Sequence, residues 1–383
     1  MLTVEIPNAK NLRIPLSRVA AAVNRNTPIE TCVYLEAEQN NNLLITAVDS
    51  RTHQLKLRVP ESEIFTAGKC ILTADIFNQM VSTLSDDPLQ LYVDENSNQL
   101  VVHQATTYAE GTNIKLDLFT APPEDFPVEA NLPNVIATVD AERFGDVIKK
   151  ALRLAERDEY ITFVGKGDTL KVYTRGASGR LFSRTVLQTK EMQEEWSVAI
   201  PMQLLAKFPN SFIGDCEICM NDDLFAICVG QEHLISRQMA TDTISYTIDC
   251  MVDKNTPNYW VVKADSLKGD LKRASFIKDK YGLKLARDKQ ALRATCGAPG
   301  RGNVDTPHQL VHAEGKIEPV RVDPTLFARA IDALECVDLV GEQVEEVVPS
   351  LSGNEDDMTI YNLRLSDQDA QDYRSIVITT IQV

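Results

Sequence analysis

The chain repeats one arrangement of helices and strands three times. Six segments have the apolar spacing of short amphipathic helices, and they fall into three pairs at a period of about 125 residues. The second helix of each pair opens alike, with Leu72-Thr-Ala-Asp-Ile-Phe, Ile200-Pro-Met-Gln-Leu-Leu and Val322-Asp-Pro-Thr-Leu-Phe. Thr73 and Asp323 suit helix caps. The predicted helices are 15–24 and 73–84, 141–156 and 201–208, and 264–277 and 323–334.

Alternating stretches between the helices predict antiparallel strands and hairpins. They include residues 89–93, 99–102, 113–119, 169–174, 216–220 and 281–286. Each repeat then reads as an α+β domain with two helices on one face of antiparallel sheets. Linkers rich in Pro, Asn and acidic residues at 121–133 and 253–259 divide the chain. We expect three domains, at 1–127, 134–252 and 257–383.

Composition narrows the classes of function. A net charge of −16 argues against a surface that is basic all over, although a basic stripe on one face is compatible with it. The eight cysteines are scattered through apolar alternating stretches, which indicates reduced, buried thiols rather than a disulfide framework. No apolar run reaches about 18 residues, and the N-terminus lacks the pattern of a secretory signal. We expect a cytoplasmic protein without a membrane span.

Three motifs that could carry chemistry have simpler interpretations. Cys216 and Cys219 have a metal-like spacing, but in a strand they face opposite sides, which favours core packing over zinc. His308 and His312 lack the glutamate of a zinc-protease helix. The segment 297–302 lacks the Gly-Lys-Ser/Thr of a phosphate-binding loop, and a surface loop is the better interpretation. No catalytic residues, metal or cofactor are predicted, and we expect that the protein is not an enzyme.

Five short motifs are distributed along the three repeats. They are Leu44-Ile-Thr-Ala-Val-Asp49, the segment from Leu116 to Asp125-Phe-Pro127, Lys171-Val-Tyr-Thr-Arg-Gly176 with Arg180-Leu181, Ser236-Arg237 with Tyr246, and the tail 376–383. In this order and spacing they resemble the bacterial DNA polymerase III beta subunit, the sliding clamp, over nearly the whole chain. The middle motif departs from that family by Arg175 and an extra Ala177-Ser-Gly179, and the tail lacks the family's Pro and Met. We expect a divergent member.

The resemblance implies that the helices line a ring around DNA and that the sheets form its outside. Basic residues recur on corresponding helices, and Arg25 follows the first helix, where the family contacts DNA. Taken singly, each of them also fits a solvated helix face. Together they favour phosphate contacts without base readout. The predicted DNA-binding residues are Arg25, Lys149, Lys150, Arg153, Lys207, Lys268, Lys272 and Arg329.

Helix width decides how many chains such a ring needs. Neighbouring axes lie about 8–10 Å apart, so six helices in a circle have a diameter of roughly 17 Å, which leaves no room for a duplex inside. Twelve helices leave a hole of about 24 Å, which admits B-DNA. Since one chain supplies six, we expect a head-to-tail homodimer. By resemblance, the interface joins Leu116 and Leu118 to Phe276 and Ile277; ordinary core packing is the alternative.

The resemblance also implies a pocket for partner peptides between the second and third domains. Thr379 and Thr380 stand where the family has Pro and Met, and Gln382 replaces an Arg, so we expect a shifted peptide preference. The alternative is that the tail only closes the last sheet. The predicted pocket residues are Thr174, Gly176, Arg180, Leu181, Ile378, Thr379, Thr380, Ile381 and Val383.

Two functions follow from these expectations. The first is a replicative processivity factor in the cytoplasm, at the nucleoid, that encircles double-stranded DNA without sequence preference. It tethers DNA polymerase and other replication and repair proteins through the pocket between the second and third domains, and the clamp loader is a further partner. The second is a clamp-fold interaction protein that binds or titrates replication proteins without encircling DNA. The basic helix faces favour the first function, because a protein that does not encircle DNA has no need of them.

Overall fold

The fold is known from a computed structural model of the 383-residue chain. It describes residues 2–40, 42–106, 109–129, 131–156, 158–176, 179–209, 213–237, 239–240, 244–348, 358–367 and 374–378. Contacts divide the chain into two compact units, one made of Met1–Glu142 with Gln203–Met239 and the other of Arg143–Met202 with Ala240–Val383. We call them unit 1 and unit 2.

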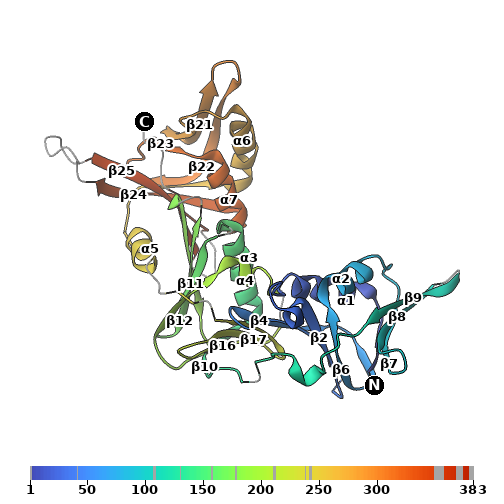
Figure 1. The fold of residues 1–383 in the computed structure, drawn as a ribbon. Coiled ribbons are helices and arrows are strands. Elements are labelled where there is room, and N and C mark those ends of the chain that lie inside the picture. The colour runs from blue at the N-terminus through green and yellow to red at the C-terminus, as the bar shows by residue number, and fades with distance from the viewer. Residues whose placement is uncertain are drawn as a thin grey trace. The chain divides into compact units, whose positions relative to one another are not determined.

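Each third of the chain has two main helices, and each of these helices is followed by antiparallel strands (Figure 1). The first third contains β1 (Thr3–Ile6), α1 (Ala9–Ala20), η1 (Pro28–Thr31), β2 (Cys32–Glu38), β3 (Asn42–Asp49), β4 (His53–Val59), β5 (Glu63–Thr66), β6 (Gly68–Thr73), α2 (Ala74–Ser82), β7 (Leu89–Asp94), β8 (Gln99–Thr106), β9 (Ala109–Asp117) and η2 (Pro123–Asp125). The middle third contains β10 (Val135–Asp140), α3 (Ala141–Leu154), β11 (Tyr160–Lys166), β12 (Thr169–Gly176), β13 (Leu181–Gln188), β14 (Glu191–Met192), β15 (Trp196–Pro201), α4 (Met202–Leu205), β16 (Asp215–Met220), β17 (Phe225–Val229) and β18 (Glu232–Ser236). The last third contains α5 (Ser245–Val252), β19 (Tyr259–Lys263), α6 (Ala264–Ile277), β20 (Leu283–Asp288), β21 (Ala291–Ala298), β22 (Gly302–Glu314), β23 (Val320–Val322), α7 (Pro324–Leu334), β24 (Asp338–Val348), β25 (Met358–Asp367) and β26 (Arg374–Ile378).

Each third contains two antiparallel meanders of three strands. The first meander follows the first helix, as in β2–β3–β4, β11–β12–β13 and β20–β21–β22. The second meander follows the second helix, as in β7–β8–β9, β16–β17–β18 and β24–β25–β26. The prediction of an α+β fold with helices on antiparallel sheets is therefore confirmed, while the domain boundaries given above stay a prediction.

Two strand junctions join consecutive thirds by the same rule. In unit 1, β4 pairs with β18, and His53 lies opposite Ser236. In unit 2, β13 pairs with β26, and Leu181 lies opposite Ile378. Each junction thus links the last strand of a first meander to the last strand of the second meander in the next third. The two junctions make continuous sheets of what would otherwise be separate ones.

The first helix begins earlier than the sequence indicated. We expected it at 15–24, but α1 spans Ala9–Ala20 and includes Pro15. Asn8 caps the helix, since its Oδ1 accepts from the backbone N–H of Lys10 at 2.8 Å. The apolar face formed by Leu12, Leu16 and Val19 is buried, and its burial outweighs the hydrogen bond that Pro15 cannot donate.

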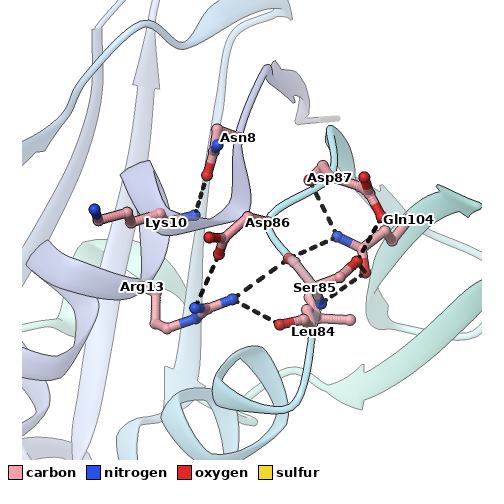
Figure 2. A network of polar contacts seen from close by, with 8 residues as sticks. All are labelled: Asn8, Lys10, Arg13, Leu84, Ser85, Asp86, Asp87 and Gln104. Carbon is pink, nitrogen blue, oxygen red and sulfur yellow. Dashed lines mark hydrogen bonds and ion pairs between the residues drawn. The ribbon is translucent and has the colours of Figure 1, made fainter.

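The loop after α2 is fixed to α1 and β8 by a polar network (Figure 2). The guanidinium of Arg13 donates to the carbonyl oxygen of Leu84 at 2.6 Å and pairs with Asp86 at 3.1 Å. The buried Gln104 accepts from the backbone N–H of Ser85 and donates to the carbonyl oxygens of Ser85 and Asp87. The network holds α1 and α2 side by side in unit 1, so Arg13 is used for structure on this helix pair.

The other helices lie close to their predicted ranges. α6 matches the prediction, and α7 starts one residue late because Asp323 is its cap, accepting from Thr325 N–H at 2.8 Å. α4 is shorter than the predicted 201–208 and continues as turns that end at Phe208. Thr73 stands at the cap position of α2 but makes no cap hydrogen bond with its side chain.

The core of unit 2 leaves no room beside Trp260. This fully buried indole packs against Gly341 of β24, where a Cβ atom would lie 2.2 Å from the ring. Changing Gly341 to Ala should therefore lower the free energy of unfolding by about 1–3 kcal/mol. At Gly269 of α6, an added methyl group would meet no atom within 4 Å. There the same change should stabilise by about 0.5–1 kcal/mol, since alanine favours a helix. Urea unfolding of the two variants measures both changes in the free energy of unfolding. Equal changes for Gly341→Ala and Gly269→Ala would contradict this packing.

Candidate nucleic-acid interface, edge strands and partner pocket

Two of the predicted basic residues on α3 have acidic partners. The ammonium group of Lys150 lies 2.8 Å from Asp146 and 3.5 Å from Glu335, and only 12% of its side chain is exposed. Arg153 pairs with Glu335 and also donates to the carbonyl oxygen of Asp332. Lys149, the residue before Lys150, is exposed. The α3 face is therefore basic but partly neutralised by its own neighbours.

Three predicted DNA-binding residues line one open cleft in unit 2. Arg153 of α3, Lys268 of α6 and Arg329 of α7 surround a volume of about 580 Å³, together with Ile331, Asp332 and Glu335. Lys268 pairs with Asp265 at 2.7 Å, and Lys272, one turn further along α6, is exposed. The structure thus brings residues that are far apart in sequence to one cleft that is large enough for an anionic group.

Arg329 has a structural task that the sequence did not reveal. Its Nη2 donates to the carbonyl oxygens of Arg153 at 3.0 Å and Leu154 at 2.9 Å, at the C-terminal end of α3. A cation is favourable there, because helix carbonyls lack partners at that end. The same carbonyl of Leu154 stands 2.1 Å from where a Cβ on Gly176 would lie, so only glycine fits at the end of β12. Arg329 and Gly176 together fix the end of α3.

Unit 1 holds the remaining two predicted DNA-binding residues. The side chain of Arg25 is 76% exposed and lies 3.5 Å from Asp75 of α2. Lys207 follows α4 and is half-buried, and burial lowers the pKa of its ammonium group. We predicted Lys207 on a polar helix face, whereas it lies beside the buried His53, whose pKa it also lowers. Arg25 is thus the more accessible of the two.

Two buried histidines make the β4·β18 junction sensitive to acid. Burial lowers the pKa of His53 and of His233 to about 4 each. Because the folded pKa lies below the ordinary value of about 6.5, stability is present above pH 6.5 and is lost as the pH falls toward 4. Between pH 7 and pH 5 each histidine should cost about 2 kcal/mol of unfolding free energy. Urea unfolding at pH 7 and pH 5 should show a clearly smaller loss of unfolding free energy for a His53→Gln/His233→Gln variant than for the unsubstituted protein. An equal loss in both proteins would contradict the role of these histidines.

The predicted interface residues of unit 1 border an apolar groove. Leu116 lies on β9 and is largely buried, and Leu118 follows it. With α2 they line an open groove of about 430 Å³, which Ile76 and Met80 of α2 also line. Ile76 is 50% exposed and Met80 is 41% exposed, which is unusual for such apolar side chains. The groove runs beside β9, whose described residues pair only with β8.

The predicted interface residues of unit 2 divide into one exposed and one buried side chain. Phe276 of α6 is 71% exposed, while its neighbour Ile277 is packed in the apolar core around Trp260. In the same unit, residues Gly302–Gln309 of β22 pair with β21 alone among the described strands. Pro307 stands in this stretch, and proline within a sheet is tolerated at an edge. Unit 2 therefore presents an exposed phenylalanine and an edge strand.

The structure gathers the described part of the predicted partner pocket at the β13·β26 junction. Gly176 lies opposite Leu181, and Leu181 lies opposite Ile378. Leu181 and Ile378 are fully buried in the core of unit 2, and Thr174 is 2% exposed. Arg180 is more open, with its guanidinium 4.0 Å from Asp323. Thr379, Thr380, Ile381 and Val383 lie outside the described residues.

A helix that the sequence analysis missed covers the other face of this junction. Ile248 and Val252 of α5 pack on Tyr173, Phe182 and Val377. Asp249 of the same helix accepts from the hydroxyl of Tyr173 at 2.9 Å and pairs with the buried Arg184 at 2.7 Å. The spacing of Ile244, Ile248 and Val252 was a signal for this helix, but it is only two turns long.

The motifs set aside in the sequence lie where the simpler interpretations place them. Cys216 and Cys219 are buried on β16. His308 and His312 lie on β22, a strand, and His308 is buried against Asp270. The segment 297–302 spans the end of β21, the turn at 299–301 and the first residue of β22. No described helix is long and apolar enough to span a membrane.

Similarity to known proteins adds to this geometry. Residues 7–133 match the family described as DNA polymerase III beta subunit, N-terminal domain. Solved structures match over the full chain. The beta subunit of Thermotoga maritima gives a TM-score of 0.78 at 15% identity, and each chain is covered completely. The chain has the fold of a beta sliding clamp.

Other clamps match in the same way. The DNA polymerase sliding clamp of Bacillus subtilis gives a TM-score of 0.75 at 13% identity, with 100% of this chain and 99% of that chain covered. The beta subunit of Pseudomonas aeruginosa gives 0.74 at 15% identity, and both chains are covered completely. No curated protein matches by sequence. The clamp fold is thus kept in a chain whose sequence has diverged far, as the short motifs indicated.

Proposed function

We propose that this protein is a DNA sliding clamp, in which two copies close a ring around double-stranded DNA and tether a DNA polymerase and other replication and repair proteins, with a clamp loader as a further partner. The proposal includes three domains at the boundaries predicted above and a place in the cytoplasm, at the nucleoid. The task is tethering rather than catalysis. The observation that carries the proposal is the pair of edge strands left over by the junction rule.

The junction rule supports ring closure by a second copy. Each junction pairs the last strand of a first meander with the last strand of a second meander, as in β4·β18 and β13·β26. Among the described strands, β22 still lacks a second-meander partner and β9 lacks a first-meander partner under this rule. A second copy supplies both, because its β9 can add to β22 and its β22 to β9. We propose that these head-to-tail contacts close after two copies, since a ring of two copies leaves neither edge without a partner.

The side chains beside these edges are complementary in kind. Phe276 offers an exposed aromatic ring on α6, the helix that packs against β22, and the groove along α2 and β9 offers apolar walls beside the other edge. An aromatic anchor in a pocket is a common centre of a protein interface. Ile277 contributes less than the resemblance implied, since it already packs in the core of unit 2.

The helix faces support sliding on DNA. Lys149, Lys272 and Arg25 are exposed cations on or after lining helices, and the cleft of Arg153, Lys268 and Arg329 adds three more. Cations on helix faces attract phosphates without reading bases, which leaves the ring free to move along the duplex. We propose in addition that partner peptides bind at the β13·β26 junction, near Thr174, Gly176, Arg180, Leu181 and the chain end.

A second candidate is a clamp-fold protein that binds replication proteins without encircling DNA. The observation in its favour is the set of carboxylates among the cations, namely Asp146, Asp265 and Glu335. These acids weaken the attraction for phosphate.

Retention on circular DNA tests the proposed function and separates the two candidates. The protein and a nicked plasmid are dialysed together out of high salt, so that rings close around the DNA, and then passed over a sizing column. A clamp should stay with the circle and be lost once a restriction enzyme linearises it. Equal retention on circular and linear DNA, or none on either, would contradict encirclement.

A further inference from the structure

Glu335 occupies a position that two local rules disfavour. It follows α7 with a φ of 53°, in the left-handed region where glycine is the usual residue at the end of a helix. It also places a carboxylate at the C-terminal end of a helix, where the helix dipole favours a cation. A glutamate here must be stabilised by contacts elsewhere.

Those contacts are with Arg153, which lines the cleft, and with the neighbouring Lys150. Oε1 of Glu335 is hydrogen-bonded to Nη1 of Arg153, and Oε2 lies 3.5 Å from the ammonium group of Lys150. Lys268 and Arg329 line the same cleft of about 580 Å³. The carboxylate is thus held where the anionic oxygens of a phosphate would find the three cations of the cleft, with Lys150 behind them. With 42% of its side chain exposed, Glu335 can move out to solvent.

We propose that this cleft is a phosphate-binding subsite for the DNA backbone and that Glu335 is its internal competitor, displaced whenever a phosphate enters. The proposal rests on the DNA-encircling function proposed above. In the absence of DNA, Glu335 keeps Lys150 and Arg153 in place. On DNA, each phosphate contact here has to displace an existing ion pair, which shortens the lifetime of the contact and favours movement along the duplex.

The state of the carboxylate supports the competition at neutral pH. The hydrogen bond from Arg153, aided by the charge of Lys150, holds the pKa of Glu335 below its ordinary value. Glu335 therefore stays ionised at the pH of a cell, and its effect on DNA binding should not change between pH 6 and pH 8.

The test compares Glu335→Gln with Glu195→Gln. Glu195 also pairs with a lysine, Lys166, at 3.5 Å, but it immediately precedes β15 and does not line the cleft. Both variants lose one negative charge, so they differ only in its position. Binding to a labelled linear duplex is followed by fluorescence anisotropy from 50 to 200 mM salt. We expect Glu335→Gln to bind about 3–10-fold more tightly at 50 mM salt, with a slope of log K against log salt that is steeper by about 1. Glu195→Gln should stay within about twofold of the unsubstituted protein.

A second variant keeps the inference falsifiable. If Glu335 acts through Arg153, the gain should disappear when Arg153→Gln is added to Glu335→Gln. Equal affinities and slopes for the Glu335 and Glu195 variants would overturn the inference, as would a gain that survives the loss of Arg153. Loss of retention on circular DNA by the unsubstituted protein would instead overturn the proposed function, so the two failures are distinguishable. Thermal unfolding confirms that each variant is folded.

Discussion

Replacing Phe276 by aspartate should convert a dimeric protein into a monomer at micromolar concentration. The ring of Phe276 is 71% exposed on α6, so it contributes little to the core of its own unit. If it fills the groove of a second copy, its removal loses about 2–3 kcal/mol, and burying a carboxylate there costs several more. A two-copy ring has two such contacts, so dimer affinity should fall by at least about 10³-fold.

The control for this variant is Val337→Asp. Val337 is 70% exposed in the same unit, between α7 and β24, and lies outside the proposed interface. Sedimentation at several concentrations should give monomer for the Phe276 variant and dimer for the control. Met80→Asp, which alters the groove in unit 1, should behave like the Phe276 variant. A Phe276→Asp protein that remained fully dimeric would remove Phe276 from the interface.

Reversing the charge of two exposed lysines, on α3 and α6, should release the proposed clamp from DNA. Lys149 and Lys272 are exposed on α3 and α6, whereas Lys150 and Lys268 are already paired with acids. A Lys149→Glu/Lys272→Glu variant removes two of the cations that we propose to contact phosphates in each copy, and it adds repulsion. Because a two-copy ring then lacks four of these cations, the salt slope should fall by about 3–4, and affinity at low salt by roughly 10²-fold or more.

A matched variant separates this local effect from net charge. Lys166 is the last residue of β11, and its side chain is 67% exposed. Lys316 lies in the loop between β22 and β23, and its side chain is 86% exposed. Their double replacement by glutamate changes the net charge equally but should leave the salt slope unchanged. If both double variants bound DNA alike, the positions of Lys149 and Lys272 would not matter and the assigned lining would be wrong.

The threefold repeat could be predicted because the spacing of buried apolar residues recurs with it along the sequence. Helices α6 and α7 have their apolar faces at regular spacing, and Asp323 caps α7 as its sequence indicated. Pro15 misled the prediction for α1, because proline usually stands at the start of a helix rather than inside one. α5 was missed because eight residues give too short a period to recognise.

The candidate site was predictable only in part, because charge pairing is a tertiary property. The sequence places Arg153, Lys268 and Arg329 on three helices, but it cannot show that they meet or that Glu335 lies among them. Burial is equally hidden: Ile277 and Phe276 are neighbours in sequence, yet one is in the core and the other in solvent. The residue types indicate the chemistry, and the packing decides which of them are available.

The mass of the protein in solution tests the central claim most directly. If β9 and β22 of two copies close the ring, light scattering at micromolar concentration should give close to twice the 42.6 kDa of one chain, and the value should stay constant on moderate dilution. A mass of one chain at every concentration, or a series of growing open chains, would contradict a closed two-copy ring.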